Sequence, residues 1–139
     1  MPAKGFISYA PGDRDFADQL IHALNTEGHG RAITFWSDHE LKAGEHWDDH
    51  LRDALRQADV LIAIMTPAAL DSAWVMSELG AAHAAKKPVI PVIPPRRSVD
   101  VRSFVPNSSP IKAGSRSIAA VAREVLDRVE DLVSNPAAA

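Results

Sequence analysis

Short apolar runs alternate with stretches of helical spacing along the chain. Four of these runs are rich in β-branched and aromatic residues and are typical of buried strands: residues 4–10 (KGFISYA), 31–36 (RAITFW), 59–65 (DVLIAIM) and 88–93 (PVIPVI). Helices between them predict right-handed crossovers and a mainly parallel sheet with helices on both faces. We therefore expect a single flavodoxin-like, doubly wound α/β domain with a sheet of about five strands.

Start and stop signals bound the first predicted helix. Asp13 is a candidate N-cap and Gly28 a candidate stop. The apolar side of this helix carries residues at helical spacing: Phe16, Ala17, Leu20, Ile21 and Leu24. Residues 47–58 predict a second, shorter amphipathic helix with Leu51 and Leu55 on its inner side.

A further helix is predicted between the third and fourth strands. Thr66 and Pro67 form a cap followed by a first-turn proline, and Ser72 is a second candidate cap, after which the helix becomes regular. We expect this helix to run to about residue 87, because Pro88 ends it. Pro91 disfavours the very middle of a hydrogen-bonded ladder for the fourth strand.

The last third of the chain gives a weaker pattern followed by a strong one. Residues 94–115 hold several prolines and little periodicity, with a short edge strand expected near 109–113. Residues 116–133 predict a closing helix with one apolar stripe. We expect the domain to span residues 1–134, with 135–139 as a disordered tail or linker.

Composition and charge narrow the class of protein. The 139 residues are 46% hydrophobic, which is enough for one domain with a real core. The formal net charge of -3 gives no electrostatic reason to expect nucleic acid. There is no cysteine, which excludes disulfides and thiolate chemistry. No stretch approaches the ~20 apolar residues of a membrane span, nor the apolar run of a signal peptide. We expect a cytoplasmic domain without a membrane partner.

The turns after the predicted strands exclude several common doubly wound proteins. The first turn, SYAPGDRD, contains neither GxGxxG nor GxxxxGK[ST], so it lacks both phosphate-binding loops. Thr66 and Pro67 follow the third strand where a phosphoacceptor receiver domain would place an aspartate. There is also no GxSxG nucleophile elbow.

Four stretches in order resemble a TIR (Toll/interleukin-1 receptor) domain of the bacterial kind. They are FISYA followed by DRDFADQL, then FWSDHELKAGEHW, then VLIAIMTPAALDSAW, and finally SAWVMSEL, which is similar to the family signature Ser-x-Trp-Cys-x-x-Glu-Leu. The resemblance covers roughly residues 4–93. Val75 stands where many relatives have cysteine, and Pro11-Gly12 replaces the more usual polar or basic pair.

The resemblance implies that Glu78 is the catalytic residue of an enzyme that cleaves NAD at the nicotinamide–ribose bond. Glycosidases usually need two carboxylates, because the departing oxygen must be protonated. The nicotinamide of NAD is already a pyridinium cation and departs as a neutral molecule, so one carboxylate can suffice. Trp74, four residues earlier on the same side of the helix, offers an aromatic face to that cation.

The same resemblance points to further substrate-binding residues at strand ends, in the long loop and at the start of the helix that carries Glu78. These are Tyr9, Ala10, Asp38, Trp47, Ser72 and Trp74. Two of them also have structural interpretations, which stay open: Trp47 would anchor the start of its helix, and Ser72 would only cap the next one. For Glu78 the structural alternative is a solvated or ion-paired glutamate on a helix edge, meeting Lys86 or Arg14.

Two functions from different classes follow. The first is an NAD+ hydrolase of immune or defence signalling, activated by self-assembly of TIR domains and yielding ADP-ribose or a cyclic isomer. The second is a non-catalytic TIR–TIR interaction module, as a signalling adaptor or as a decoy against host immunity. His46 and His50 lie four residues apart with Asp49 nearby, but no third ligand follows at a diagnostic spacing, so we expect no metal. We also expect no cofactor beyond NAD+ as the substrate.

Overall fold

The structure is a computed structural model that describes residues 3–37, 53, 55–102, 104, 105 and 108–134. Its strands are β1 (Ala3–Ser8), β2 (Ile33–Trp36), β3 (Val60–Ile64), β4 (Val89–Ile93) and β5 (Ile111–Lys112). Its helices are the 3-10 turn η1 (Pro11–Asp13), then α1 (Arg14–Glu27), α3 (Pro67–Leu70), α4 (Ala73–Ala84) and α5 (Ile118–Ser134). Each predicted strand is present, including the short one expected near residues 109–113.

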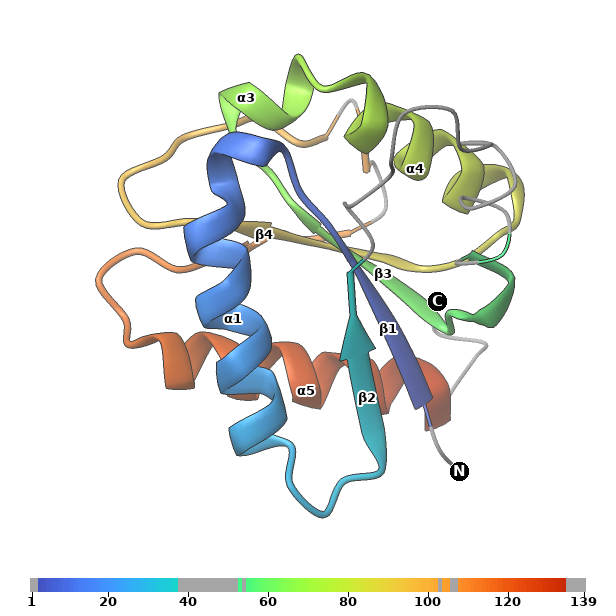
Figure 1. The fold of residues 1–139 in the computed structure, drawn as a ribbon, viewed down its shortest axis with the longest axis vertical. Coiled ribbons are helices and arrows are strands. Elements are labelled where there is room, and N and C mark those ends of the chain that lie inside the picture. The colour runs from blue at the N-terminus through green and yellow to red at the C-terminus, as the bar shows by residue number, and fades with distance from the viewer. Residues whose placement is uncertain (1–2, 38–52, 54, 103, 106–107, 135–139) are drawn as a thin grey trace.

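The five strands form one parallel sheet in the order β2-β1-β3-β4-β5 (Figure 1). The predicted doubly wound α/β fold is therefore confirmed. The chain passes from β1 outwards to β2, then returns to place β3 on the other side of β1. The carboxyl ends of β1 and β3 form the topological switch point, where folds of this kind bind ligands.

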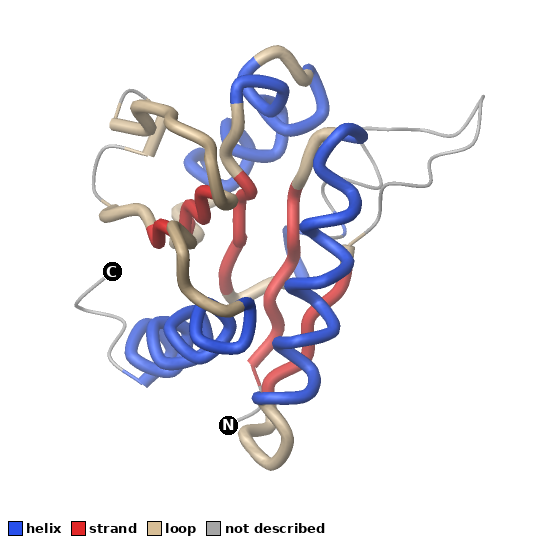
Figure 2. The backbone as a smooth tube through the Cα atoms, turned by 90° about the vertical axis from the view of Figure 1, so that its left-hand side faces the viewer, coloured by secondary structure: helices blue, strands red, loops and turns tan. Residues whose placement is uncertain are grey.

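Two apolar cores hold the helices on opposite faces of the sheet. Residues of α1 and α5 form one core with the side chains of one sheet face, and residues of α3 and α4 form the other core. Figure 1 shows α3 and α4 on one side of the strands, with α1 and α5 on the other. The view in Figure 2, turned by 90°, shows the strands as a layer between helices. β3 is buried along its whole length, as its continuous apolar run predicts.

The helix starts agree with the sequence signals. Thr66 caps α3 by accepting a hydrogen bond from the Ala69 amide, and Ser72 caps α4 in the same way. Asp13 and Gly28 flank α1 as predicted. The Asp13 carboxylate, however, makes no capping bond and instead accepts a hydrogen bond from Thr66.

Helix α4 ends earlier than the predicted residue 87. The amide of Lys86 donates to the His83 carbonyl and the amide of Lys87 to the Ala82 carbonyl, which is the pattern of a Schellman motif. Lys86 takes the left-handed conformation of that motif, with φ 58°. Glycine usually marks this position, so a lysine there gave no signal in the sequence.

Pro91 lies inside the sheet, although proline removes a ladder donor. The carbonyls of Pro88 and Val92 accept hydrogen bonds from β3, so Pro91 turns its nitrogen towards β5. Pairing with β5 begins only at Val92. The missing N–H therefore falls where the neighbouring strand has not yet begun, which explains why the proline is tolerated.

Candidate active site

Helix α4 carries the candidate catalytic glutamate and is held firmly on the sheet. The Ser72 hydroxyl accepts a hydrogen bond from the Val75 amide at 3.3 Å, which fixes the start of the helix. Val75, Leu79 and Ala82 are buried in the same apolar core as the β3 residue Ala63. Ser72 therefore caps α4, as its structural interpretation predicted. The cap fixes the start of the helix that carries Glu78.

Glu78 is completely buried, with 0% of its surface exposed. Its Oε1 accepts a hydrogen bond from the hydroxyl of Ser8, the last residue of β1, which is likewise fully buried. The alternative of a solvated glutamate on a helix edge is therefore wrong. Glutamate is almost never fully buried unless it has partners, and buried ionisable groups concentrate at functional sites.

Trp74 lies one helical turn before Glu78 on α4. Its ring is partly buried and packs against the α3–α4 core. Residues four apart share one side of a helix, so both side chains belong to the side of α4 that borders the sheet. An aromatic face and a carboxylate therefore lie on neighbouring turns.

Tyr9 and Ala10, at the end of β1, belong to different layers. Successive residues of a strand point to opposite faces. Tyr9 is buried in the core formed with α1 and α5, whereas Ala10 is buried with Phe6 in the core formed with α3 and α4. The structure therefore brings Ala10 to the same layer as Glu78 but places Tyr9 in the opposite one.

The loops after β1 and β3 are tied together at the switch point. The Thr66 hydroxyl donates a hydrogen bond of 2.5 Å to the Asp13 carboxylate, while its oxygen caps α3. Thr66 is 1% exposed. A polar contact thus joins the segments that follow the two strands, and α3 lies close to the start of α1 (Figure 1).

Two predicted substrate-binding residues, Asp38 and Trp47, lie outside the described residues, as do Leu51 and the group of His46, Asp49 and His50. In the part of the chain that the structure describes, no cluster of three or more acidic, histidine or cysteine side chains could hold a metal ion. Leu55, from the same predicted helix as Leu51, is buried as expected.

Ser8 is the residue of this site that the sequence analysis missed. It lies between Phe6 and Ala10 on the side of β1 that faces α3 and α4. The signal was a hydroxyl at an inward position of an otherwise apolar strand. Buried hydroxyls normally have a hydrogen-bond partner, so such a serine implies a polar group opposite it.

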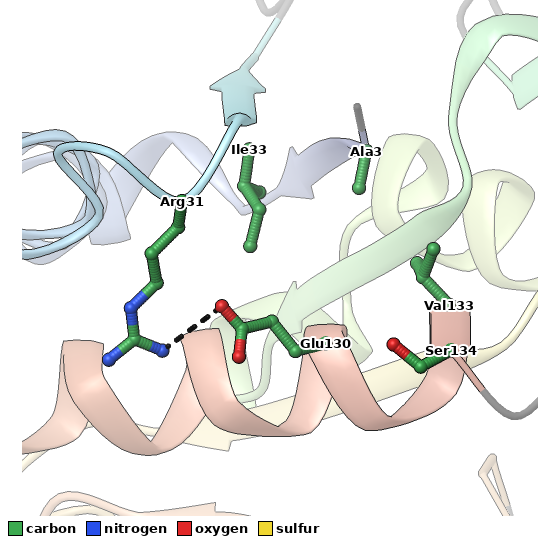
Figure 3. Close-up of a pocket in the computed structure, with 6 residues that line it drawn as sticks. All are labelled: Ala3, Arg31, Ile33, Glu130, Val133 and Ser134. Atoms are coloured by element: carbon green, nitrogen blue, oxygen red, sulfur yellow. Dashed lines mark ion pairs between the residues drawn. The ribbon is translucent and has the colours of Figure 1, made fainter. Parts of the chain in front are cut away.

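A groove of about 280 Å³ lies at the opposite end of the sheet (Figure 3). It is lined by Ala3, Arg31, Ile33, Glu130, Val133 and Ser134. The Arg31 guanidinium lies 2.8 Å from Asp127 and 3.5 Å from Glu130. The hydrogen bond to Asp127 raises the pKa of Arg31. The positive charge of Arg31 in this groove is thus already paired with two carboxylates, and β1 separates the groove from Ser8 by roughly 16 Å.

No helix within the described ranges has both the length and the apolar character needed to cross a membrane.

Comparison with known proteins gives one consistent family. A family model described as the TIR domain matches residues 6–122. The TIR domain of the Toll-related receptor TRR-2 from the lower metazoan Hydra magnipapillata has a TM-score of 0.68 at 17% sequence identity, covering 91% of this chain and 97% of that chain. The TIR domains of the activated Roq1 resistosome, which directly recognises the pathogen effector XopQ, have a TM-score of 0.54 at 21% identity, covering 96% of this chain and 74% of that chain.

No curated protein matches the chain significantly. At these identities, the likeness to the two solved structures shows the fold alone.

Proposed function

The chain belongs to the TIR-domain family, and from this premise we propose that it is an NAD+ hydrolase of the bacterial kind with Glu78 as its catalytic residue. It would cleave the nicotinamide–ribose bond and release nicotinamide and ADP-ribose or a cyclic isomer. We further propose that it acts in immune or defence signalling in the cytoplasm, a location that the absence of cysteine fits.

The observation that carries this proposal is the buried, hydrogen-bonded carboxyl group of Glu78 beside the end of β1. A glutamate with only a structural task is normally at the surface, because burial of a carboxylate costs free energy. Glu78 instead reaches the edge of the sheet where doubly wound folds bind ligands. A carboxyl group that is buried at this place, despite the free-energy cost of burial, is a candidate catalytic group.

The proposed reaction needs a single carboxylate. As the nicotinamide–ribose bond breaks, the bonding electrons move to the pyridinium ring, which leaves as neutral nicotinamide, and positive charge develops on the ribose. Glu78 would hold the ribose hydroxyls and stabilise that charge. Water then adds to the ribose carbon and its proton passes to the solvent; in the cyclic product an adenine nitrogen takes the place of water.

Trp74 and the strand ends would bind the rest of the substrate. The indole ring of Trp74, one turn from Glu78, suits the cationic nicotinamide ring. Ala10 has a small side chain in the same layer, which would leave space for the ribose. Asp38, Trp47, Ser72 and Tyr9 remain candidate contacts on the family resemblance.

Complete burial of Glu78 means that substrate can contact it only after covering side chains move. We propose that association with other TIR domains supplies this change, so that the separate chain is the resting form. No nucleic acid, membrane, metal or further cofactor is required.

A non-catalytic TIR–TIR interaction module is the second candidate function. One observation favours it: the Ser8–Glu78 hydrogen bond would also serve simply to fasten α4 to β1. In that case the chain would act as an adaptor or decoy, and Glu78 would never contact a substrate.

An assay of nicotinamide release separates the two functions. We expect purified protein at high concentration to consume NAD+ and release nicotinamide, and Glu78→Gln to lower the rate at least about 100-fold, since loss of one group that stabilises transition-state charge has effects of that size. Glu130→Gln, in the distant groove, is the matched control and should retain the rate. Turnover that survives Glu78→Gln would exclude Glu78 as the catalytic residue.

Metal removal gives a further expected outcome. Because one carboxylate can perform the proposed cleavage, dialysis against EDTA should leave the rate of nicotinamide release unchanged. A rate that falls with EDTA and returns with a divalent cation would contradict the metal-free reaction.

A further inference from the structure

Ser8 occupies an unusually fixed position. It is the last residue of β1, two positions beyond the end of the pairing with β2, and its Cα is in register with Ala63 of β3. Its neighbours on the same side of the strand, Phe6 and Ala10, are both buried. The hydroxyl therefore projects from the carboxyl end of a strand whose backbone is held by its pairing with β3 and by buried neighbours.

The partner of Ser8 is fixed as well. Glu78 lies in the same helix as Val75, Leu79 and Ala82, which are packed into the α3–α4 core. The hydrogen bond from Ser8 to Glu78 Oε1 thus joins two rigid elements across 70 positions of the chain. The backbone is therefore held in place at both ends of the bond.

The bond restricts the last torsion of the Glu78 side chain. Rotation of a carboxyl group about its last bond is broad and roughly two-fold, so burial of the aliphatic part does not set the direction of the two oxygens. A donor on Oε1 sets that direction and with it the orientation of Oε2. Catalysis is sensitive to such placement, because a misplacement of about 1 Å can cost on the order of 100-fold in rate.

We propose that Ser8 is a positioning residue that orients the Glu78 carboxylate for cleavage of NAD+. This inference rests on the proposed function, since it assigns to Ser8 a task in that same reaction. Ser8 does not contact the substrate; it acts through Glu78. Its loss should therefore change the turnover number and leave substrate binding nearly unaltered.

The test compares three substitutions at Ser8 with a matched serine elsewhere. Ser8→Ala removes the donor, Ser8→Cys keeps the size but leaves only a weak donor, and Ser8→Thr keeps the hydroxyl. Ser108→Ala is the control, because Ser108 also donates a partly buried hydrogen bond, of 2.8 Å to the Val89 carbonyl. Circular dichroism establishes that each variant is folded, and kcat and KM for NAD+ are measured under conditions where the unsubstituted protein is active.

We expect kcat of Ser8→Ala and of Ser8→Cys to fall by about 10-fold to 100-fold with KM changed less than about 3-fold. Ser8→Thr should recover most of kcat, and Ser108→Ala should match the unsubstituted protein. If Ser8→Ala does not fold, the Ser8→Cys variant decides.

Three results would overturn the proposal. If Ser8→Ala and Ser8→Cys turn over as fast as Ser108→Ala, Ser8 has no positioning task, while the proposed function stands. If KM rises at unchanged kcat, Ser8 serves substrate binding instead. If the unsubstituted protein releases no nicotinamide even when clustered, the proposed function fails, and the role of Ser8 fails with it.

Discussion

Adjacent residues of β1 point to opposite layers, and this alternation decides which side chains can reach Glu78. Ser8 and Ala10 share the layer of α4, whereas Tyr9 belongs to the layer of α1 and α5. The family resemblance singled out Tyr9 as a substrate contact and overlooked Ser8. A count of positions along the strand, starting from the buried Phe6, would have placed Ser8 on the side of β1 that faces α4.

The contact between Ser8 and Glu78 can be tested on stability, independently of any activity. Removing one member of a buried hydrogen-bonded pair costs about 1–3 kcal/mol, whereas removing both costs much less. We expect Ser8→Ala to lower the free energy of unfolding by that amount in the unsubstituted protein. In the Glu78→Met background, where no carboxylate remains, the same change should cost less than about 0.5 kcal/mol.

Urea denaturation of the four proteins of this cycle measures the coupling between the two sites. Equal costs of Ser8→Ala in both backgrounds would show that the hydroxyl and the carboxylate do not interact.

Asp100 and Arg102 give a pH-dependent prediction on the exposed loop after β4. Hydrogen bonds from Arg102 lower the pKa of Asp100 from 3.8 to about 2. A carboxyl group whose folded pKa is depressed contributes stability above its unfolded pKa, and that stability is lost as the pH falls towards 2. NMR titration should place the Asp100 midpoint near 2, and Arg102→Gln should return it towards 3.8. If the pKa of Asp100 were the same in the Arg102→Gln variant, the ion pair between Asp100 and Arg102 would be contradicted.

At the scale of elements, capping signals located helix starts well and helix ends less well. Thr66 and Ser72 marked their helices because a hydroxyl at that position satisfies a free amide. The end of α4 depends on the left-handed conformation of Lys86. A lysine at that position does not predict this conformation. Similarly, β4 tolerates Pro91 only because β5 is short and pairs from Val92 onwards. The sequence of β4 alone does not show where its neighbour begins.

Thr66 joins two elements, and its hydroxyl should matter more than its methyl group. The oxygen caps α3, and the hydroxyl donates to Asp13 beside α1. We expect Thr66→Val, which keeps the shape, to lower the free energy of unfolding by about 1–2 kcal/mol. Thr66→Ser keeps both hydrogen bonds and should stay within about 0.5 kcal/mol of the unsubstituted protein. Urea denaturation that finds the two variants equally stable would contradict this role.

The order of the strands and the burial of Glu78 are properties of the whole molecule. The alternation of strands and helices predicted a parallel, doubly wound sheet, which the observed strand order confirms. The burial of Glu78 was harder to foresee, because α4 (AWVMSELGAAHA) is apolar on nearly all sides and has no single stripe that marks its inner face. Only the packing of α4 on the sheet brings Glu78 to a strand 70 positions earlier.

That packing also sets a condition on activity for the molecule as a whole. A carboxylate with no exposed surface cannot meet NAD+ until the domain rearranges. If assembly supplies the rearrangement, turnover per molecule should rise with the density of the protein. A site that is open in the single domain would instead show a constant turnover per molecule.

The most direct test of the account is therefore nicotinamide release at controlled density. His-tagged protein, unsubstituted or with Glu78→Gln, is bound to vesicles with increasing fractions of nickel-chelating lipid, and NAD+ and its products are followed by mass spectrometry. We predict that the unsubstituted protein releases nicotinamide and ADP-ribose or a cyclic isomer, faster per molecule at higher density, and that Glu78→Gln releases at least about 100-fold less. Absence of nicotinamide at every density, or equal release by both proteins, would contradict the account.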